Sequence, residues 1–420
     1  MNVSKSMLML VITAAAAVSI TACGKTAAIS SSAPAAKNGS GGTLIIGATF
    51  SNIPNMDVYP DQGYEGRRFV GNQLYDPLIA QNPNTNELEP DLAQSYDTSD
   101  NKVWTFHLRP NVTFHDGTPW NTSAAVFNLD RLMKTDFKYY YAPVAALLIS
   151  KTKSIASYKA LDDMTLQITL KEPDSFFVSD LTQIYFASPA AIQKYGNEDY
   201  QNHPTGTGPF KLDKVLPRQE LDLVPNRDYW NHPPKLDKLV LRPMPDPASR
   251  LAAVLAGQIN WAEVPPTESI DQLKQKGFQV LTKPYPHIWE VIPNMAKPPF
   301  NDKRVREAFV EAIDRESMSD KLLNGAAAPA NGAMFPESKY YPEDAQKYPY
   351  DAENAKKLLK EAGYEGGLNI TLNMPTSGSG NMWPLPMSEY IQSQEEKVGI
   401  HVKFRTYDWK RNFNAEKDGL

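Results

Sequence analysis

Cysteine is almost absent from this 420-residue sequence, since Cys23 is its one example. No intramolecular disulfide is therefore possible, and a hydrophobic core must stabilise the fold. An excess of charge is missing as well, with 43 Lys and Arg against 48 Asp and Glu. Because proteins that bind phosphate backbones need a basic face, we expect no nucleic-acid partner. The apolar stretch 7–20 holds 14 residues, short of the about 20 that cross a bilayer.

Motifs for catalysis and for metal binding are also missing. The sequence contains neither a Gly-x-Ser-x-Gly elbow nor a Ser-x-x-Lys motif with its partners. Its six histidines are scattered, without the short pair spacing of a zinc or nickel site. They are His107, His115, His203, His232, His287 and His401. We therefore expect no enzyme activity, no cofactor and no resident metal ion.

The N-terminus has the features of an export signal. Lys5 precedes the uncharged stretch 7–20, and small residues follow it up to Cys23. The run Ile20-Thr21-Ala22-Cys23 resembles the bacterial lipobox, which implies cleavage before Cys23 and lipidation of its sulfur. The alternative is an ordinary secretory signal that is cut near a cysteine. The resemblance predicts an extracytoplasmic protein, anchored to the cell membrane in the periplasm or on the outer cell face.

Hydrophobic periodicity predicts both strands and helices after a polar tether. The tether, 24–42, has almost no large apolar side chains. Strands are predicted over 44–48, 103–108, 164–170, 368–372 and 402–404. Helices are predicted after a cap at Thr122 or Ser123, over 248–255, after a cap at Asn301 or Asp302, and from Asp351 to Gly363. This mixture predicts an α/β protein with more than one lobe.

Several motifs in order carry a family resemblance. The chain resembles the family 5 bacterial extracellular solute-binding proteins, the peptide- and nickel-type receptors of ABC importers, and is most similar to dipeptide- and oligopeptide-binding members. The residues that carry it are 88–96, 104–110, 114–119, 206–210, 226–230, 301–308 and 350–364. Relatives continue past the segment that resembles 406–409, so we expect a C-terminally truncated chain.

The resemblance implies a two-lobed α/β fold of the type II periplasmic binding proteins, with an extra subdomain in the first lobe. We expect a signal peptide over 1–22, then a lipidated cysteine and tether over 23–42. The first lobe is expected over 43–75 and 200–285, its extra subdomain over 76–199, and the second lobe over 286–420. Lobe closure around a ligand is the expected mode of action.

The implied function is the capture of short peptides and their delivery to the membrane subunits of an ABC permease. In such receptors the ligand backbone is paired as an added strand. A metal chelate is the alternative ligand, because the nickel branch shares this fold. A surface receptor for peptide signals and a secreted hydrolase are two further hypotheses. We expect a monomer that contacts the membrane through its lipid.

Seven candidate cleft residues follow from the resemblance. Tyr59 and Tyr64 lie in a loop that borders the cleft in relatives, and His287 and Trp289 lie near the expected hinge. The run 139–141, made of Tyr139, Tyr140 and Tyr141, falls where relatives place cleft residues. Tyrosine suits such a wall because it offers area and a hydroxyl. For each candidate the alternative is ordinary packing or surface exposure.

Two further positions stand out. The turn Gly206-Thr207-Gly208 lacks the Lys-Ser/Thr of a phosphate-binding loop, so we expect it to be structural. Glu395 breaks the amphipathic pattern set by Ile391 and Val398, which predicts an apolar residue there.

Overall fold

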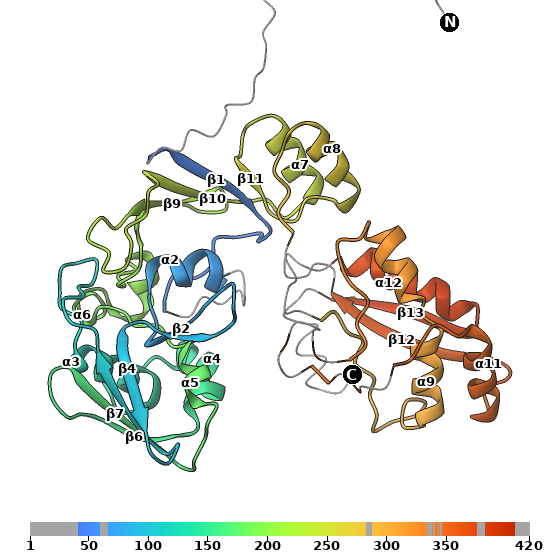
Figure 1. Ribbon diagram of the computed structural model, residues 1–420, viewed down its shortest axis with the longest axis horizontal. Coiled ribbons are helices and arrows are strands. Elements are labelled where there is room, and N and C mark those ends of the chain that lie inside the picture. The colour runs from blue at the N-terminus through green and yellow to red at the C-terminus, as the bar shows by residue number, and fades with distance from the viewer. Residues whose placement is uncertain are drawn as a thin grey trace, which may run out of the picture. The chain divides into compact units, whose positions relative to one another are not determined.

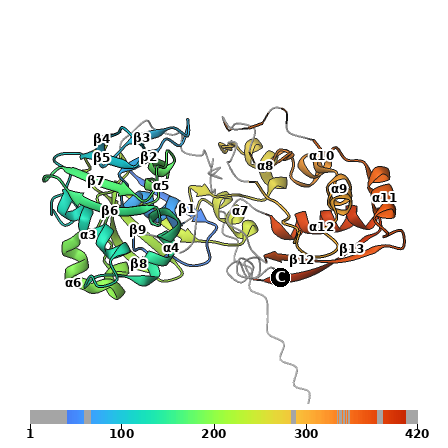
Figure 2. The same ribbon diagram turned by 90° about the horizontal axis from the view of Figure 1, so that it is seen from below.

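The computed structural model describes residues 41–58, 66–282, 288–332, 334, 338, 341–342, 344, 347–375 and 383–407. Within these residues the chain combines helices with four β-sheets, as Figures 1 and 2 show. The mixed α/β class predicted from the sequence is confirmed.

The first sheet is a mixed one with the strand order β11-β1-β10-β9-β8. Its strands are β1 (Thr43–Ala48), β8 (Phe210–Leu216), β9 (Glu220–Pro225), β10 (Lys238–Pro243) and β11 (Trp261–Ala262). Strand β1 is parallel to both neighbours, and Ile46 lies opposite Leu241 on one side and Trp261 on the other. The apolar run predicted as the first buried strand is thus the centre of the parallel part of this sheet.

Two helices follow the parallel strands. They are α7 (Pro247–Leu255) and α8 (Ile270–Gln275), with the 3₁₀ turn η3 (Thr267–Ser269) before α8, and Figure 1 shows them beside β11. Asp246 caps α7 by accepting from the Ser249 N–H at 2.7 Å. Gly257, at φ 70°, ends the helix as predicted. Ala253, Val254, Ile259 and Leu273 form the small apolar core here.

The second large sheet is antiparallel, with the order β4-β5-β7-β6. Its strands are β4 (Ala93–Thr98), β5 (Val103–Leu108), β6 (Ile155–Ala160) and β7 (Thr165–Leu170). Trp104, Phe106 and Leu108 are buried while the residues between them are half-buried, which confirms the predicted alternation. Around it lie η1 (Arg67–Gly71), α2 (Asn72–Leu74), β2 (Ile79–Gln81), β3 (Leu88–Pro90), α3 (Thr122–Met133), α4 (Ala142–Thr152), α5 (Phe177–Leu181), α6 (Pro189–Asp199) and η2 (Tyr200–Asn202).

The N-cap predicted for α3 was wrong. Asn121 caps the helix with an extended backbone, and its side chain accepts from the Ala124 N–H at 3.0 Å. Thr122 is already helical, and its hydroxyl donates to the Asp162 carbonyl at 2.7 Å. All three polar residues suit a cap, so tertiary contact to Asp162 decides which one takes the position.

The C-terminal part contains a two-stranded parallel sheet of β12 (Leu368–Pro375) and β13 (Ile400–Tyr407). Figure 2 shows α9 (Lys303–Glu311), α11 (Ala352–Glu361) and α12 (Pro384–Glu396) on one side of it. The short helices α10 (Arg315–Ser317) and η4 (Met318–Leu322) complete this part. Asp302 and Asp351 cap α9 and α11, each accepting a backbone N–H at 2.9 Å, as predicted. Both strands are longer than predicted because eight residue pairs align between them.

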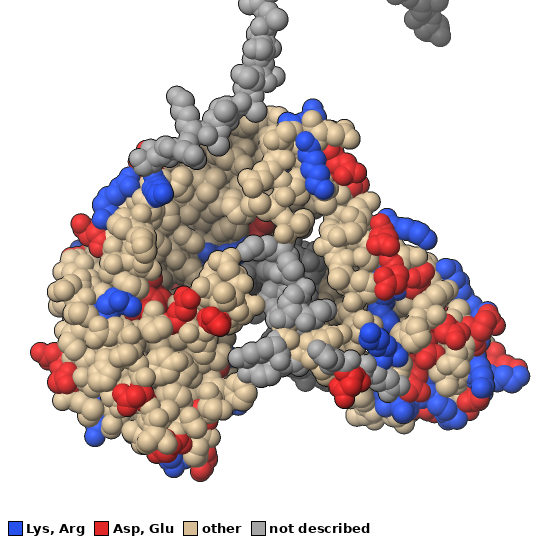
Figure 3. Space-filling view, viewed as in Figure 1, with Lys and Arg blue, Asp and Glu red and all other residues tan. Residues whose placement is uncertain are grey.

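Exposed charges on these C-terminal helices occur as pairs of opposite sign. Lys303 and Glu307 on α9, and Lys357 and Glu361 on α11, are spaced i, i+4 and lie within ion-pair distance. Figure 3 shows blue and red side chains interspersed over this part, whereas the N-terminal part is mainly uncharged on the face in view.

Candidate functional site

The carboxyl ends of β1, β10 and β11 meet at one edge of the first sheet. Strand β10 lies on one side of β1, and the chain then passes through α7 to β11 on the other side. The chain that leaves β1 thus returns to the sheet on the β8 side, whereas the chain that leaves β10 returns on the β11 side. Open α/β sheets bind ligands outside the carboxyl ends of their strands at such a switch point. We call this region, made of Thr49, Met244, Glu263, Val264 and the side chains that hold them, the carboxyl edge.

Glu263 is the buried acid of the carboxyl edge. It follows β11, is 5% exposed, and accepts from the Thr49 N–H at 3.0 Å and the Thr49 hydroxyl at 2.9 Å. The guanidinium of Arg68, brought by the π-helical turn η1, forms an ion pair with the same carboxylate. A buried carboxylate is stable only with such partners, so the carboxyl edge carries a neutralised charge.

Arg250 holds the backbone of the carboxyl edge. It extends from α7, is 2% exposed, and donates to the carbonyls of Glu263 at 2.6 Å, Val264 at 2.9 Å and Met244. Burial lowers the pKa of Arg250 to about 10, which leaves it charged at neutral pH. One side chain therefore joins the ends of β10 and β11.

Gly47 allows α7 to approach this closely. A Cβ atom at Gly47 would fall 2.6 Å from Cδ1 of Ile259 and 3.6 Å from Cγ of Arg250. The first distance is shorter than any stable carbon contact, so any larger residue would displace Ile259 beside Arg250. The sequence offered no sign of this arrangement, because Gly47, Arg250 and Glu263 are brought together only by the fold.

The predicted tyrosine run 139–141 lies between α3 and α4 and is half-buried. The side-chain amide of Asn197 donates to the carbonyls of Tyr139 and Tyr140, each at 3.1 Å. The ring of Tyr141 lies 5.3 Å from the Arg131 guanidinium. The backbone of the run is thus fixed by the end of α6. The ring of Tyr139 packs against Phe127 and Phe137.

A buried ion pair lies beneath this run. Arg131 of α3 and Asp57 are 1% exposed each, and two parallel hydrogen bonds of 2.8 and 2.7 Å join them. The paired geometry is the strongest that a carboxylate and a guanidinium form. It fastens the segment after β1 to the second sheet. No local pattern in the sequence indicates this pair, since its partners are 74 residues apart.

The family-like motifs converge on Asp76. This carboxylate is 4% exposed and accepts from the Thr207 hydroxyl at 2.8 Å, the Tyr229 hydroxyl at 3.0 Å and the Trp230 indole at 3.1 Å. Burial raises the pKa of Asp76, and the three donors oppose that rise. A Cβ atom at Gly206 would lie 2.0 Å from the Leu74 carbonyl oxygen. The structural interpretation of the glycine-rich turn is therefore confirmed.

The remaining predicted residues are distributed as follows. Trp289 is half-buried and packs against the apolar cluster of the C-terminal part. Four lie outside the described residues, and the structure gives no account of them: Cys23, Tyr59, Tyr64 and His287.

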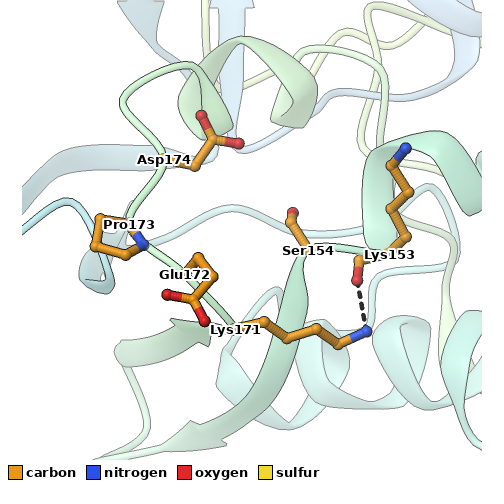
Figure 4. A pocket seen from close by; sticks show the side chains of 6 residues that line it. All are labelled: Lys153, Ser154, Lys171, Glu172, Pro173 and Asp174. Carbon is orange, nitrogen blue, oxygen red and sulfur yellow. Dashed lines mark hydrogen bonds between the residues drawn. The ribbon is translucent and has the colours of Figure 1, made fainter.

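Other surface features of the described residues do not form a competing site. Figure 4 shows a hollow at the ends of β6 and β7, where Lys171 donates to the Lys153 carbonyl at 2.7 Å and the other lining side chains are small or charged. Across the described ranges no three His, Cys, Asp or Glu residues are grouped as metal ligands would be. Nor does any helix within those ranges have the length and apolarity that a bilayer crossing requires.

Comparison with known proteins identifies the family. The family described as bacterial extracellular solute-binding proteins, family 5 (middle region), matches residues 87–419. The chain belongs to this family of solute-binding proteins.

Individual relatives agree on the family and differ in ligand. The dipeptide-binding protein of Escherichia coli K12 is 31% identical over 82% of this chain and 68% of its own length. Heme-binding protein A of Haemophilus influenzae is 30% identical over 83% of this chain and 67% of its own length. Membership therefore defines a binding protein without fixing its ligand.

A solved structure supplies the fold. The ABC transporter-associated periplasmic binding protein of Helicobacter pylori, in complex with the peptide STSA, matches 89% of this chain and 75% of its own chain, at 28% identity and a TM-score of 0.73. The chain has the two-lobed α/β fold of the type II periplasmic binding proteins, as predicted.

Proposed function

We propose that this chain is the substrate-binding lipoprotein of an ABC importer, and that it captures short peptides in an interlobe cleft for a membrane permease. The observation that carries the proposal is the match over 89% of the chain to a transporter-associated binding protein with a bound peptide. The dipeptide-binding relative supports the same ligand class. The carboxyl edge gives the first lobe a neutralised surface at the position where α/β sheets bind ligands.

Peptide binding is tested on the full chain after denaturation and refolding, which removes any ligand acquired during expression. Synthetic dipeptides, tripeptides and tetrapeptides are offered as a library and binding is followed by native mass spectrometry and calorimetry. We expect a subset to bind in a one-to-one complex. If no peptide in the library binds, the peptide proposal fails.

A metal chelate is the second candidate, and the heme-binding relative is the observation that favours it. Hemin is the probe, because its absorbance changes when a protein binds it. If hemin binds tightly and every peptide fails, the chelate candidate replaces the peptide one. If peptides bind and excess hemin does not displace them, the chelate candidate is excluded.

Import and signalling are separated in the producing cell. We expect deletion of the gene to abolish uptake of a labelled peptide that the purified chain binds. Normal uptake together with a lost transcriptional response to that peptide indicates a surface peptide-signal receptor instead. Hydrolysis of the peptide library by the purified chain contradicts both binding roles.

The proposed anchor is the lipid on Cys23. Cys23→Ala is expected to move the protein from the membrane fraction to the soluble fraction and to abolish labelling by a fatty-acid analogue. Ser32→Ala, in the same polar tether, is the matched control and is expected to stay on the membrane. Retention of Cys23→Ala in the membrane fraction contradicts the lipobox interpretation.

A further inference from the structure

Val264, at the carboxyl edge, has a backbone conformation that its side chain disfavours. Its φ is +42°, in the left-handed region, and a β-branched residue there is a genuine outlier. Within the described ranges, the five other non-glycine residues with positive φ are four asparagines and Arg218. Asparagine adopts this region readily. Such strained residues concentrate where a protein contacts a ligand. The strained backbone of Val264 therefore raises two questions: which contacts hold it, and what function it serves.

Arg250 is the cause. Its Nη2 donates to the Val264 carbonyl at 2.9 Å, its Nε donates to the Glu263 carbonyl at 2.6 Å, and its Nη1 donates to the Met244 carbonyl. Two consecutive carbonyls are thereby turned toward one buried guanidinium. The third carbonyl belongs to Met244 after β10, which lies on the other side of β1, so the turn after β11 cannot relax without disturbing the bonds that Arg250 makes to both strand ends.

The function of this conformation is indicated by the side chains that are exposed around Val264. Val264 is 39% exposed although it is apolar, and Trp261, at the start of β11, is 48% exposed. Glu263, between them, is buried and neutralised by Arg68 and Thr49. The carboxyl edge therefore presents the aliphatic side chain of Val264, and the charge of Glu263 beside it is paired. An aliphatic side chain is the chemical group that such a surface binds.

We propose that Val264 contacts an aliphatic side chain of the bound peptide, and that Arg250 is the positioning residue that holds Val264 in its strained conformation for that contact. The inference rests on the proposed function and deepens it. It predicts a preference for peptides with an aliphatic residue at the position that meets the carboxyl edge.

Val264→Gly is expected to raise thermal stability and to lower the affinity for aliphatic peptides. Glycine adopts positive φ without strain, so Val264→Gly is expected to raise Tm by roughly 2 to 4 °C. Loss of the isopropyl group is expected to weaken binding of the tightest aliphatic peptide about tenfold. Val264→Ala retains the strain and removes the contact, so it is expected to weaken binding without the gain in Tm.

Arg218→Gly is the matched control. Arg218 has φ 61°, is exposed, and lies in the hairpin between β8 and β9. Its replacement is expected to raise Tm without changing affinity. The peptide analogue with glycine in place of each aliphatic residue is expected to bind wild type and Val264→Ala alike.

The role of Arg250 is tested by a double-mutant cycle. Arg250→Lys keeps a charge but lacks the planar fork by which Nε, Nη1 and Nη2 each reach a different carbonyl, so it is expected to weaken binding of the aliphatic peptide. If Arg250 acts through Val264, the same change in the Val264→Gly background adds little further loss. Equal losses in both backgrounds overturn the positioning role.

Three results overturn the inference. If the wild type binds peptides and both Val264 variants bind them equally well, the inference fails while the proposed function stands. If Val264→Gly lowers Tm, the strain argument fails. If the wild type binds no peptide, the proposed function fails and the inference fails with it.

Discussion

Asp57 and Asp76 in the N-terminal part and Glu395 in the C-terminal part are buried acids with opposite surroundings. In the N-terminal part, Asp57 has a bidentate guanidinium and Asp76 has three hydrogen-bond donors. In the C-terminal part, Glu395 is 0% exposed, and neither of its carboxylate oxygens has a hydrogen-bond partner among the described residues. Burial raises the pKa of Glu395 to about 9. Hydrogen-bond donors thus compensate the burial of Asp57 and Asp76, whereas burial without a partner keeps Glu395 neutral at pH 7.

Loss of Arg131 is expected to have the largest effect. Arg131→Leu leaves the Asp57 carboxylate buried and uncompensated, and breaking such a pair costs about 3–5 kcal/mol. Urea unfolding followed by circular dichroism measures the change. The double variant with Asp57→Asn is expected to recover part of the loss. A loss below about 1 kcal/mol means that the pair contributes no more than a surface one.

Replacement of Glu395 is expected to stabilise the protein. A pKa near 9 in the fold, against about 4.3 in an unfolded chain, means that the folded state binds more protons. The contribution of Glu395 to stability is therefore greatest below about pH 4 and falls by about 1.4 kcal/mol per pH unit until about pH 9, where the loss levels off. At pH 7 the accumulated cost is about 4 kcal/mol, and Glu395→Gln removes much of it.

The measurement is thermal unfolding at several pH values between about 5 and 9, with wild type and variant compared. Glu389→Gln is the matched control, because this side chain of the same helix is exposed and its replacement is expected to leave the pH profile unchanged. Parallel profiles for wild type and Glu395→Gln contradict a neutral buried acid.

The Asp76 site is expected to show a smaller effect. Asp76→Asn places an amide donor against donors from Thr207, Tyr229 and Trp230, which is expected to cost about 1–3 kcal/mol. Asp91→Asn is the control, since Oδ1 of Asp91 has no hydrogen-bond partner in the part of the chain that the structure describes, and burial raises the pKa of Asp91 to about 8. Denaturant unfolding at neutral pH is expected to show no loss for Asp91→Asn. Equal losses for the two variants contradict the difference in their environments.

The smallest loss of stability is expected for an exposed ion pair. Arg227 and Asp237 lie 2.9 Å apart, but they are 56% and 63% exposed. Arg227→Gln is expected to cost less than about 1 kcal/mol, and 1 M salt is expected to reduce that cost further. A loss as large as that of Arg131→Leu means that burial is not what distinguishes the two pairs.

The sequence predicted local structure well where one residue pattern decides it. The alternation around Trp104 and Phe106 gave β5, and the caps at Asp302 and Asp351 gave α9 and α11. The prediction failed where several residues suit one position, as at the N-cap of α3. Asn121 takes the cap because the Thr122 hydroxyl bonds instead to the Asp162 carbonyl, 40 residues away along the chain. The break in the apolar pattern at Glu395 was visible in the sequence. The absence of a hydrogen-bond partner for its carboxyl group among the described residues was not.

The candidate site was less predictable than the fold. The tyrosine run was proposed because it falls where relatives place cleft residues, and that role stays a prediction, whereas its fixed backbone depends on Asn197. The carboxyl edge was not found at all. Thr49 and Glu263 are 214 residues apart, and no local pattern relates them.

The sequence by itself determined the strands and helices, the family resemblance and the absence of disulfides, because each depends on residue type and short spacing. The tertiary structure alone decided which charges are paired. Asp76 meets donors that are 131 to 154 residues away, and Arg250 meets three carbonyls from the ends of two strands. The physical reason is that hydrogen bonds and desolvation depend on distances in space of a few ångströms, which the order of residues along the chain does not specify.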